Sequence, residues 1–350
     1  MKILNRKISK NKEPFIIAEI SANHNKSIKR TIKLIREAKK VGADAIKLQT
    51  YNADSMTLNS KNKYFLIDDK KSLWNKKKLY DLYKEASLPY SWYKDIFEEA
   101  KKNNIICFST PFDENAVDFL QKFNVPAYKI ASFENNHLPL LERVISKKKP
   151  IIISLGATNK KEIDFLYKFF LKRKFYKFAF LQCTSSYPAK VEDSNIKTIL
   201  DLRKRYKIEI GLSDHTPGIG AAIASISYGA TIIEKHFTLD KNAGGFDDIF
   251  SMNPDEFRLL IKETKNAWKS LGKISYDLSL DEKRHKVFKR SIFVSKDIKK
   301  NEKFTSQNIK IVRPSFGLSP SLYKEIIGKK SLQNLKFGFP LKKNHYKKLK

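Results

Sequence analysis

Short runs of β-branched and other apolar residues recur along the first three quarters of the chain, separated by amphipathic segments with lysine-rich polar faces. Strands that alternate with helices in this way are typical of βα units, whose strands pair in parallel. We predict helices between the strands, for example at Ile28–Val41, Tyr93–Asn103, Glu114–Phe123 and Glu162–Arg173. The eight predicted strands are Phe15–Ser21, Ala45–Tyr51, Ile105–Phe112, Tyr128–Ser132, Pro150–Gly156, Phe178–Pro188, Ile208–His215 and Thr231–Thr238.

Eight strands, most of them followed by a helix, fit an α/β fold of the (β/α)8 TIM-barrel type, which usually takes ~250 residues. An open doubly wound sheet is the alternative, and it normally carries a glycine-rich phosphate turn after the first strand. The segment at that position reads SANHNK and has no glycine. We therefore predict a TIM barrel over residues 1–275.

The composition and the hydrophobic pattern of the sequence change after residue 275. Residues 276–289 are highly charged and are predicted to form a linker. Residues 290–350 are predicted to form a small, mostly β domain, with a short helix at Ser321–Ile327 and a last strand pair near Gly338. A domain of this size has a marginal core, so we expect it to pack against the barrel or a partner subunit.

Polar side chains stand at the C-terminal end of nearly every predicted strand. In a TIM barrel these ends lie together at the face that carries the active site. A full set is therefore a stronger signal than any single polar residue. The set comprises Glu19, Lys47, Gln49, Ser109, Thr110, Lys129, Ser132, Ser154, Thr184, Ser185, Ser213, His215, Glu234 and His236.

Two histidines, His215 and His236, end the seventh and eighth predicted strands. Neighbouring strand ends can bring two imidazoles to one ion, and histidine with oxygen ligands suits Mn²⁺ or a similar divalent ion such as Mg²⁺, with Zn²⁺ as another choice. A lone histidine at a strand end is more often a hydrogen-bonded structural residue. The pair favours a divalent metal site.

Lys47 and Lys129 lie inside apolar strands, where a lysine needs a counter-ion or loses its proton. A phosphate or carboxylate ligand would supply that counter-ion, and nearby hydroxyls would add hydrogen bonds. A Schiff-base lysine is one alternative. Internal salt bridges to Glu19, Glu134 or Glu234 are another. The candidate hydroxyls belong to Thr110, Ser132, Ser154 and Ser213.

Glu19, Glu134 and Glu234 follow or end strands, where a carboxylate can act as general acid or base or orient a lysine or histidine. Asn23 and His24 follow the first strand and are candidates for binding polar groups of a substrate.

Composition narrows the choice of function. The net charge of +33 comes mostly from dispersed lysines, without a zinc-finger or aromatic RNA-binding pattern, so we predict no nucleic-acid partner. The positive field would instead collect anionic substrates. No signal peptide, no membrane span and no disulfide framework is expected, since the two cysteines are isolated. We predict a cytoplasmic enzyme.

Several motifs resemble the sialic acid synthase family. They cover the chain from about residue 14 to 345, and VRPSFGL at Val312–Leu318 is similar to the antifreeze-like (SAF) domain of that family. The barrel motifs are AEI-NHN (Ala18–Asn25), AIKLQTY (Ala45–Tyr51), STPFD (Ser109–Asp113), KIASFE (Lys129–Glu134), CTSSYPA (Cys183–Ala189), GLSDHT (Gly211–Thr216), EKHFTLD (Glu234–Asp240) and GG-D (Gly244–Asp247).

Within the family the chain most resembles the branch that makes pseudaminic acid. The similarity lies in ANHN, in SLW at Ser72–Trp74, in LYDLYKEAS at Leu79–Ser87 and in Ile106–Leu120. Lys26 stands where the branch that makes N-acetylneuraminate usually has glycine. Synthesis of N-acetylneuraminate or legionaminate from another amino sugar remains the alternative.

The resemblance implies condensation of phosphoenolpyruvate with an amino-sugar aldehyde and water, with loss of phosphate by C–O cleavage. It implies a divalent metal on His215 and His236, and sugar contacts from Gln49, Tyr187 and Asp247. It also implies a domain-swapped homodimer in which Arg313 of one subunit reaches the sugar in the other. Phe246 stands where the family usually has proline, so the loop that carries Asp247 is expected to differ. The implied phosphoenolpyruvate contacts are Lys47, Thr110, Lys129, Ser132, Ser154, Ser185 and Ser213.

Overall fold

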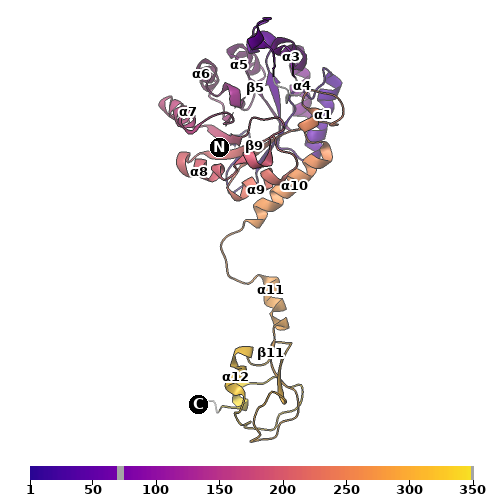
Figure 1. Ribbon diagram of the computed structural model, residues 1–350, viewed down its shortest axis with the longest axis vertical. Coiled ribbons are helices and arrows are strands. Elements are labelled where there is room, and N and C mark those ends of the chain that lie inside the picture. Colours follow the sequence, from indigo (N-terminus) through magenta and orange to yellow (C-terminus); the bar gives the residue numbers. More distant parts are fainter. Residues whose placement is uncertain (69–74, 348–350) are drawn as a thin grey trace. The chain divides into compact units, whose positions relative to one another are not determined.

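The computed structural model describes residues 1–68 and 75–347, so Ser72–Trp74 lies outside the described residues. The chain divides into two compact units, Met1–Gly272 and Lys273–Lys350 (Figure 1). Each unit is described by itself.

The first unit contains a closed barrel of eight parallel strands in the order β3 to β10, with β10 paired to β3. The TIM-barrel prediction is confirmed, and each predicted strand matches an observed one. The strands are β3 (Phe15–Glu19), β4 (Ala45–Thr50), β5 (Ile106–Pro111), β6 (Tyr128–Ile130), β7 (Ile151–Ser154), β8 (Phe178–Cys183), β9 (Glu209–Asp214) and β10 (Ile232–His236).

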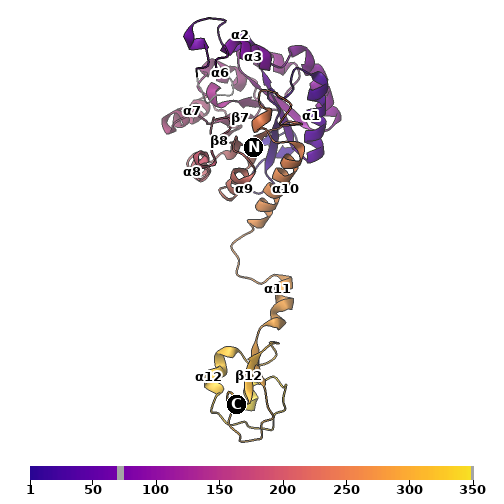
Figure 2. The ribbon, with the colours of Figure 1, turned by 45° about the vertical axis from the view of Figure 1, so that its right-hand side comes forward.

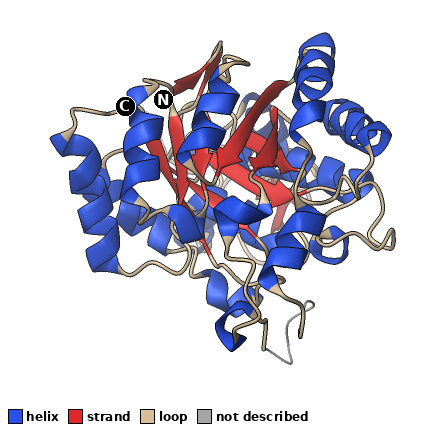
Figure 3. Cartoon of the chain, turned by 90° about the horizontal axis from the view of Figure 1, so that it is seen from above, coloured by secondary structure: helices blue, strands red, loops and turns tan. Residues whose placement is uncertain are grey.

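Helices surround the barrel on its outer side (Figures 2 and 3). The sequence explains their limits: the Ser27 side chain accepts from the amide of Arg30 at the start of α1, and Gly42 ends it with a positive φ of 97°. The helices are α1 (Ile28–Val41), α2 (Ala53–Met56), α3 (Leu79–Ala86), α4 (Tyr93–Lys102), α5 (Glu114–Gln121), α6 (Leu138–Ser146), α7 (Lys160–Lys172), α8 (Thr198–Tyr206), α9 (Gly220–Ser227) and α10 (Pro254–Ser270).

Alternation along the strands divides the core into two clusters. Outward residues such as Ile16, Ile46 and Ile233 pack under the helices. Inward residues such as Ile17 and Ile232 fill the N-terminal half of the barrel. Because successive side chains point to opposite faces of a sheet, the next inward positions on the same strands carry the polar residues at the C-terminal end.

A short hairpin, β1 (Lys2–Ile3) with β2 (Arg6–Lys7), precedes the barrel and was not predicted. Ile3 and Ile8 are 0% and 1% exposed, and they join the cluster of inward apolar side chains that includes Phe15. The hairpin therefore contributes apolar side chains to the N-terminal end of the barrel.

In the second unit, as far as residue 347, β11 (Ser291–Val294) pairs antiparallel with β12 (Ile309–Val312) beside a small core that includes Phe304 and Ile326. The predicted helix at Ser321–Ile327 appears as a 3-10 turn followed by α12 (Tyr323–Ile326). The predicted strand pair near Gly338 is wrong: this segment forms isolated bridges, Ile298 with Leu335 and Phe293 with Pro340, and no continuous ladder. Gly338 has a φ of 81°, and Pro340 lacks the N–H that a ladder needs.

The predicted linker contains regular structure, since α11 (Leu280–His285) lies within it. Ser279 and Glu282 form a capping box at its start. Across the described residues, no helix is long and apolar enough to cross a membrane.

Candidate active site

Strand register brings the polar strand ends side by side. Glu19 on β3 pairs in register with Lys47 on β4 and with His236 on β10. Ser213 on β9 is likewise in register with Glu234 on β10 and with Cys183 on β8. The barrel therefore gathers these groups from far-apart parts of the sequence at one end of its interior.

Lys47 is 4% exposed and lies among oxygen atoms. Its ammonium forms an ion pair with Glu19, donates to Thr110 Oγ1 at 3.2 Å, and lies 3.9 Å from Glu234 Oε1. Gln49 Nε2 donates to the other Glu19 oxygen at 3.3 Å. The lysine and its carboxylate neighbour are thus both held in fixed positions.

Lys129 is 2% exposed and lies opposite this group. Its ammonium donates to Ser154 Oγ at 2.7 Å and lies 3.5 Å from Glu234 Oε1. Ser213 Oγ donates to the same glutamate oxygen at 3.0 Å. The internal salt bridges that the sequence left open as an alternative are therefore present, from Lys47 to Glu19 and from Lys129 to Glu234. Binding of a phosphate or carboxylate ligand would be in addition to these salt bridges.

Burial and charge act against each other in this cluster. Burial raises the pKa of Glu19 above its ordinary value, although the positive charge of Lys47 opposes the shift. Burial acts in the same sense on Glu234, but the charges of Lys129 and Lys47 outweigh it and lower the pKa of this carboxyl. Glu234 is thus held as a carboxylate between two lysines.

Gly156 brings two predicted phosphate ligands together. Its amide donates to Ser132 Oγ at 3.0 Å. A Cβ at this position would lie 2.0 Å from Ser185 Oγ and 2.7 Å from Ser132 Oγ, so only glycine allows both hydroxyls to approach. The backbone and the two hydroxyls form a compact set of hydrogen-bonding groups.

The two histidines are neighbours, with ring centroids 5.4 Å apart. His215 Nδ1 lies 2.9 Å from the carbonyl of Thr184, which can only accept, so Nδ1 carries a proton and Nε2 is the nitrogen that is left for a ligand. Burial, with the charge of His215, lowers the pKa of His236 well below its ordinary value, and its Nδ1 is buried without a hydrogen-bond partner.

An aromatic side chain and a carboxylate complete the surroundings of the histidines. The Tyr187 ring lies 4.3 Å from His215 and 6.0 Å from His236, measured between centroids. Asp247 Oδ2 lies 3.9 Å from His236 Nδ1. The orphaned buried nitrogen of His236, next to the His215 ring whose Nε2 faces away from Thr184, fits a divalent ion. Within residues 1–68 and 75–347, no group of three His, Cys, Asp or Glu side chains is arranged to hold one.

The loop after β10 is fixed by its second aspartate. Asp248 accepts from Arg30 at 3.2 Å, from the Gly245 amide at 2.7 Å and from Thr238. Asp247 meanwhile accepts from Ser21 and lies in the cluster. Phe246, the departure from the family pattern, lies under the Lys77 ammonium at 5.0 Å. The loop therefore places Asp247 beside His236 without the usual proline.

Glu134 follows β6 and is partly buried. Burial raises the pKa of Glu134 to about 7, and one of its oxygens is buried without a partner. A carboxyl that titrates near neutral pH is suited to accept or release a proton.

That Asn23 and His24 bind polar groups of a substrate stays a prediction. Both are almost fully buried. The Asn23 amide donates to the carbonyl of Phe237 and to Ser251 Oγ, and His24 bonds to the carbonyl of Ala86 and the amide of Lys26. These contacts tie both side chains to neighbouring loops, and Asn23 Oδ1 is buried without a hydrogen-bond partner.

Comparison with known proteins places this arrangement in a family. Residues 34–276 match the NeuB family, and residues 289–347 match the SAF domain. The chain belongs to the NeuB family. The pseudaminic acid synthase of Campylobacter jejuni is 45% identical over 96% of this chain and 97% of its own length. The N,N'-diacetyllegionaminic acid synthase of the same species is 35% identical, with coverages of 93% and 98%.

A solved structure also supports membership of the NeuB family. The N-acetylneuraminic acid synthetase of Leptospira borgpetersenii, crystallised with citrate, superposes with a TM-score of 0.72 at 32% identity. The match covers 81% of this chain and 94% of that one.

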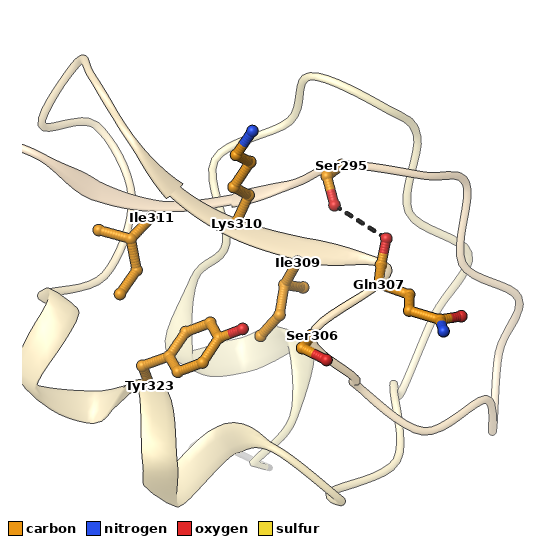
Figure 4. A pocket seen from close by; sticks show the side chains of 7 residues that line it. All are labelled: Ser295, Ser306, Gln307, Ile309, Lys310, Ile311 and Tyr323. Atoms are coloured by element: carbon orange, nitrogen blue, oxygen red, sulfur yellow. Dashed lines mark hydrogen bonds between the residues drawn. The ribbon is translucent and has the colours of Figure 1, made fainter.

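Arg313 of the NeuB-family chain lies in the SAF unit, where it lines a surface cavity of about 780 Å³ with Arg290, Lys286 and Lys289. A second cavity of this unit, of about 580 Å³, is lined by Ser295, Ser306, Ile309, Tyr323 and others (Figure 4). It contains none of the predicted site residues.

Sequence reasoning missed three neighbours of the site. Ser21 binds Asp247, and Gln49 Nε2 donates to Ser21 at 3.0 Å. Cys183 Sγ lies 3.9 Å from His215 Nδ1. Gly156 was noted only as a strand end. The sequence did offer one signal for Cys183, since it lies at a strand end two residues before Ser185, a predicted phosphoenolpyruvate ligand.

Proposed function

We propose that this chain is a pseudaminic acid synthase. It condenses phosphoenolpyruvate with 2,4-diacetamido-2,4,6-trideoxy-altropyranose and water, and it releases pseudaminic acid and phosphate. The observation that carries the proposal is the gathering of two lysines, two histidines and a set of hydroxyls at one end of a NeuB-family barrel. The choice of sugar is supported by 45% identity to a pseudaminic acid synthase against 35% to a legionaminic acid synthase.

Phosphoenolpyruvate brings negative charge to the two lysines. Its phosphate and carboxylate would be bound by Lys47 and Lys129, with hydrogen bonds from Thr110, Ser132, Ser154, Ser185 and Ser213. Because the lysines already have Glu19 and Glu234 as partners, their ammonium groups are held in position before the ligand arrives. Charged groups that are positioned in advance need little rearrangement during the reaction.

His215 and His236 would hold a divalent ion, Mn²⁺ or Mg²⁺, with water or substrate oxygens as its other ligands. When bound, such an ion supplies Lewis acidity to a carbonyl. Thr184 keeps His215 in the tautomer whose Nε2 is free. Tyr187, Gln49 and Asp247 surround the same region and would orient the hydroxyl and amide groups of the sugar.

In the reaction, carbon 3 of phosphoenolpyruvate forms a bond to the aldehyde carbon, and the aldehyde oxygen takes up a proton from solvent to become a hydroxyl. Positive charge develops at carbon 2, where water adds and loses a proton to a strand-end carboxylate, for which Glu19 is the first choice and Glu134 the second. The bond between carbon 2 and the bridging oxygen then breaks. Phosphate leaves with that oxygen, and carbon 2 becomes the ketone, closed as a hemiketal. Glu234, 3.5 Å from the Lys129 ammonium, favours the charged form of this lysine against the effect of burial.

The alternative is that the chain makes N-acetylneuraminate or legionaminate by the same chemistry. An assay of phosphate release from phosphoenolpyruvate decides among the three products. It is run separately with each amino sugar, with and without EDTA. We expect release with the diacetamido-trideoxy-altrose, little with N-acetylmannosamine, and none with EDTA. Label in the bridging oxygen of phosphoenolpyruvate should leave with phosphate, and its retention in the sugar acid would exclude C–O cleavage.

We further propose a cytoplasmic homodimer in which the SAF unit of one subunit covers the barrel of the other. The basic surface around Arg313 suits an anionic, polar site. Both cysteines are free and buried, as expected for a reducing compartment.

A further inference from the structure

Ser21, the second residue after β3, has a backbone conformation that suits glycine. Its φ is 47°, in the left-handed region where the Cβ of most residues comes too close to the backbone. The residue is 7% exposed, so this unfavourable conformation lies in the interior of the unit and not at a free loop tip. A buried residue that keeps such a conformation indicates that its side chain has a specific task.

The Ser21 hydroxyl joins two residues that the proposed function assigns to the sugar. It donates its one proton to Asp247 Oδ2, and Gln49 Nε2 donates to it at 3.0 Å. Chemistry sets the direction of both bonds, because a carboxylate only accepts and the hydroxyl has no second proton. The hydroxyl thereby connects β4 with the loop after β10.

Ser21 also determines how the Gln49 amide is oriented. One N–H of this amide goes to Ser21, and the other goes to Glu19 Oε1 at 3.3 Å. Since an amide nitrogen has only two hydrogens, Gln49 Oε1 is the atom that is left for a ligand, and it can only accept. A substrate group that binds to Gln49 must therefore donate, as a hydroxyl group does.

Asp247 depends on the same hydroxyl for its position. The Ser21 hydroxyl is the close donor to its Oδ2, while the amide of Ala22 lies at the longer distance of 3.5 Å. His236 Nδ1 lies 3.9 Å from this oxygen, beyond hydrogen-bonding distance. Without the hydroxyl, the carboxylate would be free to turn toward the histidine. Ser21 thus holds Asp247 apart from His236, as a second acceptor within two hydrogen bonds of Gln49.

We propose that Ser21 is a positioning residue for the sugar, whose hydroxyl orients Gln49 and Asp247 so that both accept from hydroxyl groups of the substrate. Glycine would relieve the backbone strain, but it has no side chain to connect these two residues. A preference for sugars with a hydroxyl group at this place is then determined by a residue that does not touch the sugar. This inference rests on the proposed synthase function.

Ser21→Gly and Ser21→Ala separate positioning from a structural role. Both variants remove the hydroxyl, but only glycine relieves the backbone strain. We therefore expect Ser21→Gly to have the higher melting temperature of the two. The kcat/KM for the sugar should nevertheless fall by about 100-fold in both, because misplaced binding groups have an effect of that size. The KM for phosphoenolpyruvate should change little in either variant.

Lys207→Gly is the matched control. Lys207 ends α8 with a φ of 54°, so this variant also replaces a left-handed residue by glycine. Its side chain is exposed and precedes β9, whereas the site lies at the opposite ends of the strands. We expect its melting temperature to rise while the kcat/KM for the sugar stays at the wild-type value.

Sugar analogues that each lack one hydroxyl group test whether Ser21 acts on the substrate. For a hydroxyl that Gln49 or Asp247 binds, removal of this hydroxyl and Ser21→Gly should each lower kcat/KM. The combined loss should be well below the product of the two losses, since both changes remove the same contact. Phosphate release with wild type and Ser21→Gly, each with the complete sugar and with every analogue, gives the four values for each comparison.

Three results would overturn the inference while leaving the synthase function intact. The first is a wild-type kcat/KM for the sugar in Ser21→Gly. The second is a loss that multiplies with the loss from every analogue, which would make Ser21 a structural residue. The third is a rise in the KM for phosphoenolpyruvate as large as that for the sugar. Failure of the proposed function would look different, since the wild type itself would release no phosphate with any amino sugar.

Discussion

Lys129 and Glu234 lie 3.5 Å apart although they belong to β6 and β10, which stand opposite each other in the eight-stranded ring. The pair crosses the barrel interior, so each charge depends on a partner from the far wall. Lys47 lies 3.9 Å from the same carboxylate and adds to its stabilisation.

Replacing Glu234 by glutamine should impair both stability and turnover. The free energy of unfolding should fall by about 3 kcal/mol, because removal of one partner leaves a buried charge uncompensated. Turnover should fall at least 100-fold, since a less charged Lys129 binds phosphoenolpyruvate poorly. Urea unfolding and phosphate release measure the two effects. Glu85→Gln, in the exposed pair with Lys77, is the control and should change neither.

A double variant separates the two effects. Lys129→Met with Glu234→Leu replaces the ion pair by apolar groups and should restore most of the lost stability without restoring activity. Activity in the double variant would show that neither charge takes part in the reaction.

Loss of either histidine that we propose as a metal ligand should abolish turnover. His215→Ala and His236→Ala should reduce phosphate release to background with the far-UV spectrum unchanged, and the wild type should lose activity in EDTA and recover it with Mn²⁺ or Mg²⁺. His137→Gln is the matched control, because His137 lies outside the cluster at the start of α6. Full wild-type activity in EDTA would refute the metal role.

Gly156→Ala should weaken phosphoenolpyruvate binding selectively. The new methyl group would meet Ser185 and Ser132, so both hydroxyls must move. We expect KM for phosphoenolpyruvate to rise about 10-fold, the equivalent of about one charge-assisted hydrogen bond, while KM for the sugar changes little. Gly220→Ala is the control, since an added Cβ there has open space. If only the KM for the sugar rises, Ser132 and Ser185 contact the sugar and not phosphoenolpyruvate.

Glu134 should make stability depend on pH below neutrality. Its pKa is about 7 in the folded chain against 4.5 ordinarily, so between these values the folded state holds a proton that the unfolded state has lost. The free energy of unfolding should therefore decrease as pH rises from 4.5 to 7, by up to about 3 kcal/mol. Chemical unfolding across this range should show the slope in the wild type and a flatter curve in Glu134→Gln. Identical curves would contradict the raised pKa.

Mixing two inactive variants should test the domain-swapped dimer. Glu234→Gln lacks a functional barrel site and Arg313→Ala lacks the arginine of the SAF unit. If Arg313 acts in the partner's site, co-refolded mixtures contain dimers with one complete site, and activity should return to about a quarter of the wild type for equal amounts. Light scattering should first show that both variants are dimeric. If the mixture is then still inactive, Arg313 acts in the site of its own subunit or outside any site.

Most of the barrel was predictable because each strand is a short apolar run with a polar end. The run at Ala45–Tyr51 contains β4 (Ala45–Thr50), and α1 was predicted to its observed ends because Ser27 and Gly42 mark them. The hairpin β1–β2 was missed because two-residue strands have no periodicity. The last strand pair failed because Gly338 and Pro340 turn the chain where a ladder would have to continue.

The site was predictable in its members but not in its pairings. The sequence places Lys47, Lys129 and Glu234 at strand ends, yet it does not say which carboxylate faces which lysine, because that depends on closure of the ring. Phe250 carries no polar signal, so its contact with His236 follows only from the fold of the loop.

Ile3 and Ile8 close the N-terminal end of the barrel with apolar side chains, and this has a kinetic consequence. With that end filled by hydrocarbon, both substrates and both products must pass through the opposite opening. In the binding mode that we propose, phosphate lies among the lysines and the nine-carbon acid lies between it and the opening, so the acid would obstruct its way out. The order of departure is then set by geometry: the sugar acid leaves first, and product-inhibition patterns should reveal phosphate as the last to go.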